Sequence, residues 1–276
     1  MMCAWKELLS VLPSWLAYEV DRRDRKTLQE VRLRLGMPPQ LIHTDTAQWL
    51  DRLIVADDLN FCVNTASRYS PWAVQSAAQG YITASGGHRI GLCGSAVIHD
   101  GSITGIRNLR SVSIRVARDI PGIARQYRNL KGSILIIGPP GSGKTTFLRD
   151  LLRQISEQET VAVVDERCEL FPDHFFLGRM SLDVLSSCSK TVGIDMLLRT
   201  MNPQTIAVDE ITSAEDCAGL LRAGWCGVRL IATAHAVTAT DLTRRTLYKP
   251  LIQTSLFEHI LVLHRDKTVY EERMVP

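Results

Sequence analysis

The stretch that decides the fold reads Gly138-Pro139-Pro140-Gly141-Ser142-Gly143-Lys144-Thr145. It fits the pattern Gly-x-x-x-x-Gly-Lys-[Ser/Thr] in full, with an apolar run before it and a helical stretch after it. Glycines let the backbone wrap around phosphate oxygens, and the start of a helix adds a positive dipole end. Lys144 is expected to reach the β- and γ-phosphates of ATP and Thr145 to ligate Mg²⁺, with Thr146 also counted as nucleotide-binding. The sequence therefore predicts a nucleotide-phosphate loop.

Short runs of branched apolar residues recur beyond residue 130. Four of them occupy residues 134–137, 161–164, 205–208 and 230–233. None alternates with polar residues, which is typical of strands buried on both faces of a parallel sheet. Helical stretches are expected between these runs, at residues 144–155, 189–201 and 213–223. Strands and helices in repeated alternation predict a three-layer α/β domain with a mostly parallel sheet.

The first half of the chain has a different pattern. Residues 28–35 alternate between apolar and polar in their second part, residues 111–118 alternate throughout, and residues 80–92 are typical of a hairpin with a glycine turn. These features predict a smaller α+β domain with an antiparallel sheet. We place it at residues 1–128 and the α/β domain at residues 129–276, because polar and basic residues separate the two patterns there.

Composition excludes several classes of protein. The chain has 276 residues, 45% hydrophobic and 22% charged, with 32 Lys+Arg against 29 Asp+Glu. This is not the composition of a disordered chain, and the net charge of +3 is too small to indicate nucleic acid or membrane by itself. No apolar run is long enough to span a bilayer, and the opening segment favours an amphipathic helix interrupted by Pro13 over a signal peptide. The seven cysteines form no Cys-x-x-Cys pair, which favours reduced thiols in a cytoplasmic protein.

Acidic residues follow two of the predicted strands. Asp209 and Glu210 end the run at 205–208; Asp209 is expected to hold Mg²⁺ and Glu210 to polarise the attacking water. The alternative for this pair is the acidic start of a helix. A second acidic group follows the run at 161–164, where Glu166 could order Mg²⁺ and Glu169 the lytic water, or the acids could pair with Arg167 at the surface.

A histidine follows another strand. His235 comes directly after Thr233-Ala234, at the end of the run at 230–233. Because parallel strands end at the same edge of a sheet, this histidine is expected beside the acids. A neutral imidazole there can respond to the γ-phosphate through a hydrogen bond, and the alternative is a loop histidine without a role in chemistry.

Four elements, taken in order, resemble those of the RecA-like ATPases of type II and type IV secretion: the phosphate loop, the acidic box Glu166-Arg167-Cys168-Glu169, Asp209-Glu210 and Thr233-Ala234-His235. A narrower resemblance is to the stage III sporulation protein AA family. It is carried by residues 80–83, 86–91, 113–118 and 164–167, and by Met201-Asn202-Pro203 ahead of Asp209-Glu210-Ile211. Two positions differ from these patterns, since Thr212 stands where the secretion ATPases usually have arginine and Ala236 where the sporulation family has glycine.

The resemblance implies a RecA-like C-terminal domain and a cytoplasmic, hexameric ATPase that docks on a membrane protein complex. In sporulating bacteria that complex is the channel between mother cell and forespore. By position, the resemblance also assigns Glu169 to the Asp box of the secretion ATPases, Glu210 to their Walker B element and His235 to their His box. It further implies that arginines of the N-terminal domain reach the nucleotide; Arg115 and Arg118 fit this role best, and Arg89 and Arg107 less well.

Two other functions are compatible with a RecA-like core. A nucleic-acid remodelling ATPase would use the basic stretch at residues 22–26, but acids interrupt this stretch and no aromatic residues accompany it for base stacking, so it favours a solvated surface. A nucleotide-switched scaffold would bind ATP without significant turnover. The intact pair of acids after the strand at 205–208 argues against a scaffold.

Overall fold

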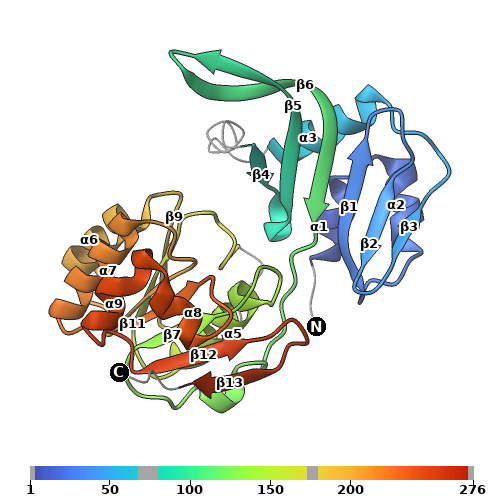
Figure 1. Cartoon of the computed structure of the whole chain (residues 1–276). Coiled ribbons are helices and arrows are strands. Elements are labelled where there is room, and N and C mark those ends of the chain that lie inside the picture. Colours follow the sequence, from blue (N-terminus) through green and yellow to red (C-terminus); the bar gives the residue numbers. More distant parts are fainter. Residues whose placement is uncertain (1–3, 68–79, 173–179, 273–276) are drawn as a thin grey trace. The chain divides into compact units, whose positions relative to one another are not determined.

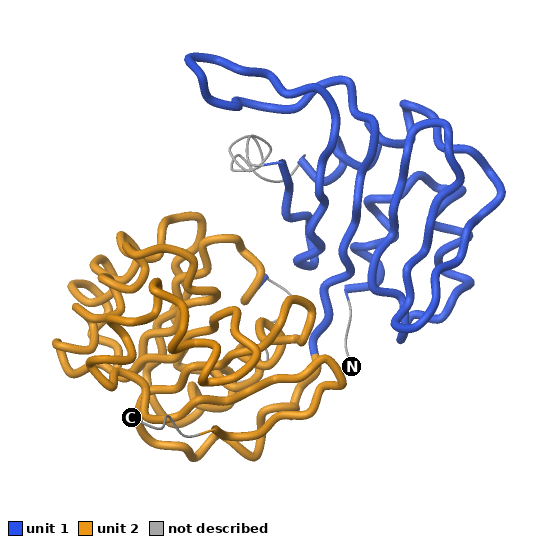
Figure 2. Tube along the Cα trace, viewed as in Figure 1, with its two compact units in different colours: residues 1–119, 172–175 blue, residues 120–171, 176–276 orange. Residues whose placement is uncertain are grey.

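The computed structural model describes residues 4–67, 80–172 and 180–272. The chain divides into two compact units, residues 1–119 with 172–175, and residues 120–171 with 176–276 (Figure 2). The predicted boundary at 128/129 is therefore placed too late. The intervening residues belong to the second unit because the N–H groups of Gly122 and Ala124 donate to the Asp150 carboxylate, each at 2.9 Å. Tyr127 also packs edge-on against Phe147, with ring centroids 5.6 Å apart.

The first unit is built on a six-stranded antiparallel sheet with the strand order β3-β2-β1-β6-β5-β4 (Figure 1). Its core joins one face of this sheet to three helices, so that Val31 and Ile114 share a cluster with Leu8, Leu16 and Leu59. This architecture agrees with the predicted α+β domain. The elements are α1 (Trp5–Ser10), α2 (Ser14–Asp21), β1 (Leu28–Arg34), β2 (Gln40–His43), β3 (Ala47–Trp49), α3 (Ala56–Ser67), β4 (Tyr81–Thr83), β5 (Arg89–His99) and β6 (Ser102–Arg115).

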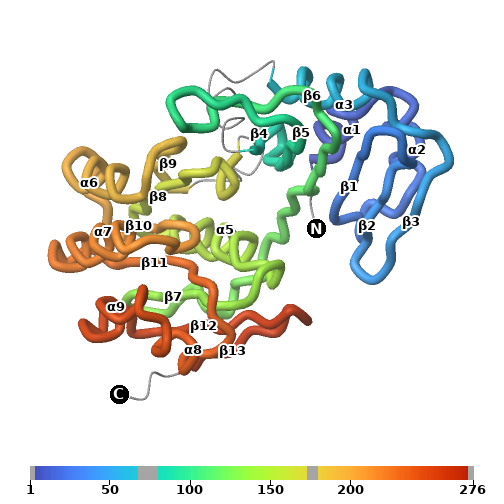
Figure 3. Tube along the Cα trace, turned by 45° about the horizontal axis from the view of Figure 1, so that its top comes forward, coloured from blue at the N-terminus to red at the C-terminus, as the bar shows by residue number. Residues whose placement is uncertain are grey.

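The second unit contains a seven-stranded sheet with the order β13-β12-β7-β11-β10-β8-β9, which Figure 3 shows from β9 to β13. All neighbouring strands are parallel except β12 and β13. The elements are β7 (Ile134–Ile137), α5 (Lys144–Ile155), β8 (Val161–Asp165), β9 (Leu182–Ser186), α6 (Lys190–Thr200), β10 (Thr205–Val208), α7 (Ala214–Trp225), β11 (Arg229–Ala234), α8 (Ala239–Arg244), α9 (Lys249–Gln253), β12 (His259–Leu263) and β13 (Val269–Glu272).

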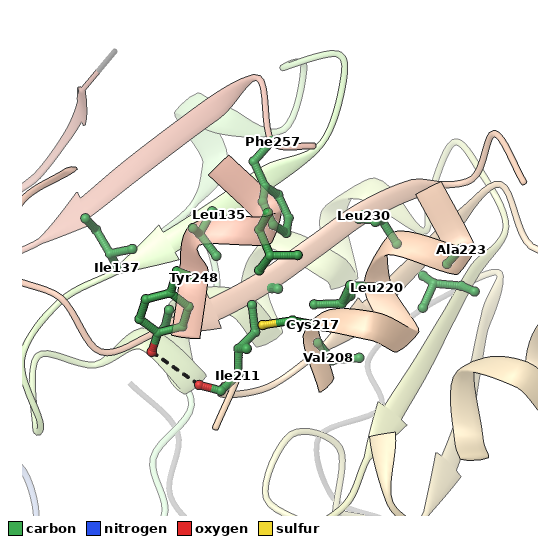
Figure 4. Close-up of a cluster of buried hydrophobic side chains, with 14 of the residues drawn as sticks. Leu135, Ile137, Val208, Ile211, Cys217, Leu220, Ala223, Leu230, Tyr248 and Phe257 are labelled. Carbon is green, nitrogen blue, oxygen red and sulfur yellow. Dashed lines mark hydrogen bonds between the residues drawn. The ribbon is translucent and has the colours of Figure 1, made fainter. Parts of the chain in front are cut away.

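Both faces of the second sheet are buried. Alternate residues of β7 enter two separate clusters: Leu135 and Ile137 pack with α6, α7 and α9, while Ile134 and Ile136 pack with α5. Figure 4 shows the first cluster, where the Tyr248 hydroxyl donates to the carbonyl of Ile211 at 3.3 Å. The four predicted strands and three predicted helices of this unit are confirmed.

Three strands of this sheet were not predicted, the two edge strands β9 and β13 and the strand β12 beside β13. In β9 and β13 exposed positions mix with half-buried ones, because each lies at an edge and needs no continuous apolar run. By contrast, β12 does contain the buried run 260–263, which a search for apolar runs could have found. These additions matter for the site, since β12 lies beside β7 with Val262 opposite Ile137.

Candidate nucleotide-binding and catalytic site

The glycine-rich loop, residues 138–143, connects the end of β7 to the start of α5. Gly141 and Gly143 have φ values of 77° and 101°, in the left-handed region that favours glycine. Gly138 is required for space, because a Cβ atom there would lie 2.5 Å from the carbonyl oxygen of Leu263. The buried Ser142 hydroxyl has no hydrogen-bond partner among the described residues, so the loop retains a donor that a phosphate oxygen could satisfy.

The Lys144 side chain is folded back over this loop. Its ammonium donates to the carbonyl oxygens of Gly138 at 2.9 Å and Pro139 at 3.2 Å, and to His235 Nδ1 at 3.0 Å. Burial lowers the pKa of Lys144, while the carboxylates of Glu210 and Asp209 act in the opposite direction. A partly desolvated ammonium held by neutral acceptors is well suited to exchange them for phosphate oxygens.

Asp209 lies at the carboxyl end of β10 and faces the start of α5. Its Oδ2 accepts a hydrogen bond of 2.8 Å from the Thr145 hydroxyl. The predicted Mg²⁺ ligands Thr145 and Asp209 are thus adjacent. No group of three or more His, Cys, Asp or Glu side chains within residues 4–67, 80–172 and 180–272 could hold a metal ion alone. Two oxygen donors at this position fit Mg²⁺ when phosphate oxygens and water complete its shell.

Thr233 organises the pair of acids, a role that the sequence did not indicate. Its fully buried hydroxyl donates to Asp209 Oδ1 at 2.8 Å and accepts from the backbone N–H of Glu210, also at 2.8 Å. The register of the parallel strands could have indicated this contact, because Val208 lies opposite Ala232 and the next pair is Asp209 and Thr233. Thr233 therefore fixes both the Asp209 carboxylate and the backbone of Glu210.

We expect replacement of Thr233 by valine to reduce the predicted turnover of ATP about 10- to 100-fold. Valine keeps the shape of the side chain but releases both acids from their positions. The Mg²⁺ concentration for half-maximal activity should rise as well, since Asp209 loses a partner. The measurement is steady-state phosphate release over a Mg²⁺ titration. Thr233→Ser retains the hydroxyl and should stay close to the wild type; equal losses in both variants would contradict this role.

Glu210 is held in an unusual backbone conformation with its carboxylate engaged. Its φ is 28°, which residues other than glycine rarely adopt. Oε1 lies 2.8 Å from His235 Nε2 and Oε2 lies 3.4 Å from an Arg167 guanidinium nitrogen. An ammonium can only donate, so His235 Nδ1 accepts from Lys144 and Nε2–H donates to Glu210. Lys144, neutral His235 and Glu210 are therefore connected by two successive hydrogen bonds.

The second acidic group is held mainly by other residues. Asp165, at the end of β8, accepts the N–H groups of Glu169, Leu170 and Phe171, and its burial raises the pKa of this carboxyl. Asp165 thus shapes the turn that follows β8. The Glu169 backbone N–H is part of that turn. The Glu169 side chain is not among those that line the hollow at the strand ends. That hollow is lined by Val164, Asp165, Glu166, Arg167, Lys190, Asp209 and Glu210.

Lys190 is a further residue that the sequence did not indicate. It is 4% exposed, and its ammonium lies 2.5 Å from a Glu166 carboxylate oxygen and 3.5 Å from one of Asp216. Glu166, predicted as a metal ligand, therefore has a buried lysine as its partner in this structure. A lysine at the start of a helix is typical of a surface position, and nothing in the sequence connects residues 166 and 190.

The candidate arginines lie in the first unit. The Arg118 guanidinium donates to the carbonyl oxygens of Lys26 and Leu28, so it stabilises the backbone before and at the start of β1. Arg115 and Arg89 are cross-strand neighbours on β6 and β5. Together with Tyr81 and other residues of this sheet they line a hollow of about 280 Å³, and the Arg89 guanidinium lies 4.1 Å from the centre of the Tyr81 ring. Contact between any of these arginines and a nucleotide stays a prediction.

Comparison with known proteins identifies the family. The chain matches the family model described as "Sporulation stage III, protein AA" over residues 8–273. It is 36% identical over 282 residues to "Stage III sporulation protein AA" of Bacillus subtilis (strain 168), an alignment that covers 95% of this chain and 91% of that protein. The chain belongs to the stage III sporulation protein AA family. The narrower resemblance stated from the sequence is thereby confirmed.

Solved structures show that this member of the stage III sporulation protein AA family has the fold of the secretion ATPases. The Legionella pneumophila ATPase DotB matches with a TM-score of 0.62 at 18% identity, over 95% of this chain and 80% of that one. The pilus retraction motor PilT, solved with bound ADP, matches with a TM-score of 0.59 at 15% identity, over 90% of this chain and 79% of that one. The predicted α/β, RecA-like class agrees with both.

Proposed function

We propose that this chain binds ATP at the loop 138–146 and hydrolyses it in a Mg²⁺-dependent reaction. The observation that carries the proposal is the connected set of Lys144, Thr145, Asp209, Glu210 and His235 at the carboxyl ends of β7, β10 and β11. Phosphoryl transfer requires positioning and neutralisation of charge more than covalent chemistry, and these are the groups that supply both. Family membership supports the same activity.

Each residue has a role in the proposed reaction. Lys144 leaves its loop carbonyls to contact the β- and γ-phosphates. Thr145 and Asp209 would hold Mg²⁺, which when bound neutralises charge on the phosphate oxygens. Glu210 orients the attacking water, and Thr233 keeps its backbone in place. Glu169 and Glu166 remain candidates for the water and the metal, respectively.

The two hydrogen bonds from Lys144 through His235 to Glu210 link ATP binding to the catalytic acid. Departure of Lys144 towards phosphate removes the donor from His235 Nδ1. The imidazole can then turn or take a proton, and either change alters its hydrogen bond to Glu210. In this proposal Glu210 becomes available to the water after ATP has entered. The arginines Arg115 and Arg118, or the weaker candidates Arg89 and Arg107, would add positive charge from the other unit or from a neighbouring subunit.

The cellular role is also a proposal. We infer a cytoplasmic, hexameric ATPase that acts as a motor or assembly factor on a membrane protein complex of sporulation, at the channel between mother cell and forespore. Membership in the sporulation family supports this role, and the fold shared with DotB and PilT is compatible with it. Among the described residues, no helix combines the length and the apolar character needed to cross a bilayer. The proposed point of attachment is a membrane protein of the sporulation complex, as the family resemblance implies.

The test combines assembly and turnover in one preparation. Light scattering with and without Mg²⁺ and ATP should reveal a nucleotide-dependent six-subunit species, and the same sample should release phosphate. Added DNA or RNA should leave the rate of phosphate release unchanged, because the expected partner is a membrane protein and not a nucleic acid. Strong stimulation by nucleic acid, or ATP-dependent assembly without any phosphate release, would contradict the proposal.

A further inference from the structure

The glycine-rich loop has a second neighbour that contributes a cation. The strands β12 and β13 are joined by a turn over residues 264–268, and β12 lies parallel to β7. The carbonyl of Leu263, at the end of β12, therefore lies against Gly138, so closely that a Cβ at this glycine would be 2.5 Å away. The turn after β12 is thus positioned beside the loop after β7.

Within this turn, Lys267 is aimed at the loop. Its ammonium donates to the carbonyl oxygen of Gly141 at 2.7 Å, and a Cβ on Gly143 would be 4.0 Å from the same nitrogen. The carbonyls of Gly138 and Pro139, in the same loop, accept hydrogen bonds from Lys144. Two lysines from distant parts of the sequence therefore bond to different carbonyls of the loop.

The conformation of the turn is defined by several hydrogen bonds. Lys267 has a φ of 71°, which is uncommon for a residue with a side chain. Its N–H donates to the carbonyl of His264 at 3.1 Å, and the N–H of His264 donates to Thr268 at 3.0 Å. The Asp266 carboxylate accepts from both the backbone and the hydroxyl of Thr268, at 2.9 and 2.7 Å. These bonds hold Lys267 in a position that the chain would not adopt by default.

The charged residues beside Lys267 in the turn are not its hydrogen-bond partners, whereas the Gly141 carbonyl of the loop is. Asp266 is engaged by Thr268 within the turn, and Arg265, like Lys267 itself, is an exposed residue of the turn. The ammonium loses water against the loop, and this desolvation lowers the pKa of Lys267. A bound polyphosphate would favour the charged form of Lys267. The attraction between this ammonium and the loop site is therefore largest when an anion occupies the loop.

We propose that Lys267 is a second cation of the nucleotide site, bonded to the loop through Gly141 and close enough to attract the polyphosphate of ATP. This inference rests on the proposed function of the loop. It differs from the role of Lys144, which contacts phosphate directly, because Lys267 keeps its bond to the loop and acts on the anion through charge. Its ligand is the phosphate chain itself, so the nucleoside should not alter its contribution.

The experiment measures binding of ATP and of inorganic pyrophosphate in the presence of Mg²⁺, by displacement of a fluorescent ATP analogue from the full chain. Lys267→Met, which removes the charge and keeps the length, should weaken both ligands about tenfold at low salt. Lys267→Arg should restore affinity to within about twofold of the wild type, because charge and donor are both kept. The matched control is Arg265→Met, which removes the same charge from an exposed position of the same turn and should change affinity less than about twofold.

Salt separates an electrostatic role from a purely structural one. The loss in Lys267→Met should shrink markedly at about 0.5 M salt, because screening removes the contribution of charge in the wild type. A loss of the same size at both salt concentrations would indicate only a structural tie and overturn the proposal. Unchanged affinity in Lys267→Met, or an equal loss in Arg265→Met, would also overturn it. Failure of the wild type to bind ATP would instead contradict the proposed function.

Discussion

Replacing Glu210 with glutamine is expected to slow ATP hydrolysis at least about 100-fold while ATP remains bound. The amide keeps the size of the side chain and can still accept the hydrogen bond from His235 Nε2, which now measures 2.8 Å to Oε1. It cannot take a proton from water or orient it as a carboxylate does. The measurement pairs phosphate release under saturating ATP with equilibrium binding of a fluorescent ATP analogue.

The control for this variant is Glu157→Gln. Glu157 is exposed just after α5, and the same chemical change there should leave turnover within about twofold of the wild type. If Glu210→Gln hydrolyses ATP at the normal rate with normal binding, Glu210 has no part in the reaction. Glu169 would then become the first candidate for positioning the water.

The second large effect is expected for Lys144→Ala, which should weaken binding of Mg²⁺ and ATP about 100-fold or more. Charge-assisted hydrogen bonds contribute about 1.5–3 kcal/mol each, so loss of contacts to two phosphates corresponds to at least about 3 kcal/mol, or about 100-fold. The expected loss is smaller for ADP than for ATP, because ADP carries the β-phosphate but no γ-phosphate. Isothermal titration calorimetry with each nucleotide measures it.

Folding of the Lys144→Ala variant must be checked separately, since its ammonium now satisfies the carbonyls of Gly138 and Pro139. Thermal unfolding without nucleotide should show a midpoint close to that of the wild type, because water can reach the emptied loop. Lys249→Ala, at an exposed position at the start of α9, is the matched control and should bind normally. A folded Lys144→Ala variant that keeps its affinity would contradict the nucleotide-binding loop itself.

Local sequence patterns were sufficient for the central part of the second unit. The runs at 134–137 and 205–208 became β7 and β10, since four consecutive apolar residues have no exposed face to turn to water. The phosphate loop pattern likewise requires a particular turn between a strand and a helix, so Lys144, Thr145 and Asp209 could be named in advance. The same reasoning missed β9 and β13, because edge strands carry no such apolar run.

The domain boundary shows a different limit. Polar and basic residues around 127–131 are typical of a linker, yet the second unit already begins at residue 120. Asp150 binds two backbone N–H groups between residues 120 and 127, and Tyr127 packs on Phe147. Such contacts join residues 20 or more positions apart in the chain and leave no local pattern, so only the tertiary structure could assign the segment.

The sequence by itself determined the class of fold, the family and the residues expected to bind phosphate and magnesium, because each of these depends on neighbours in the chain or on a fixed strand-loop-helix spacing. Only the tertiary structure decided which distant side chains hold those residues. Thr233 between the acids, Lys190 on Glu166 and Lys267 on Gly141 are brought there by the lateral order of the strands and the packing of helices. That order is fixed by burial and hydrogen bonding across the whole sheet, and no short segment of the sequence contains it.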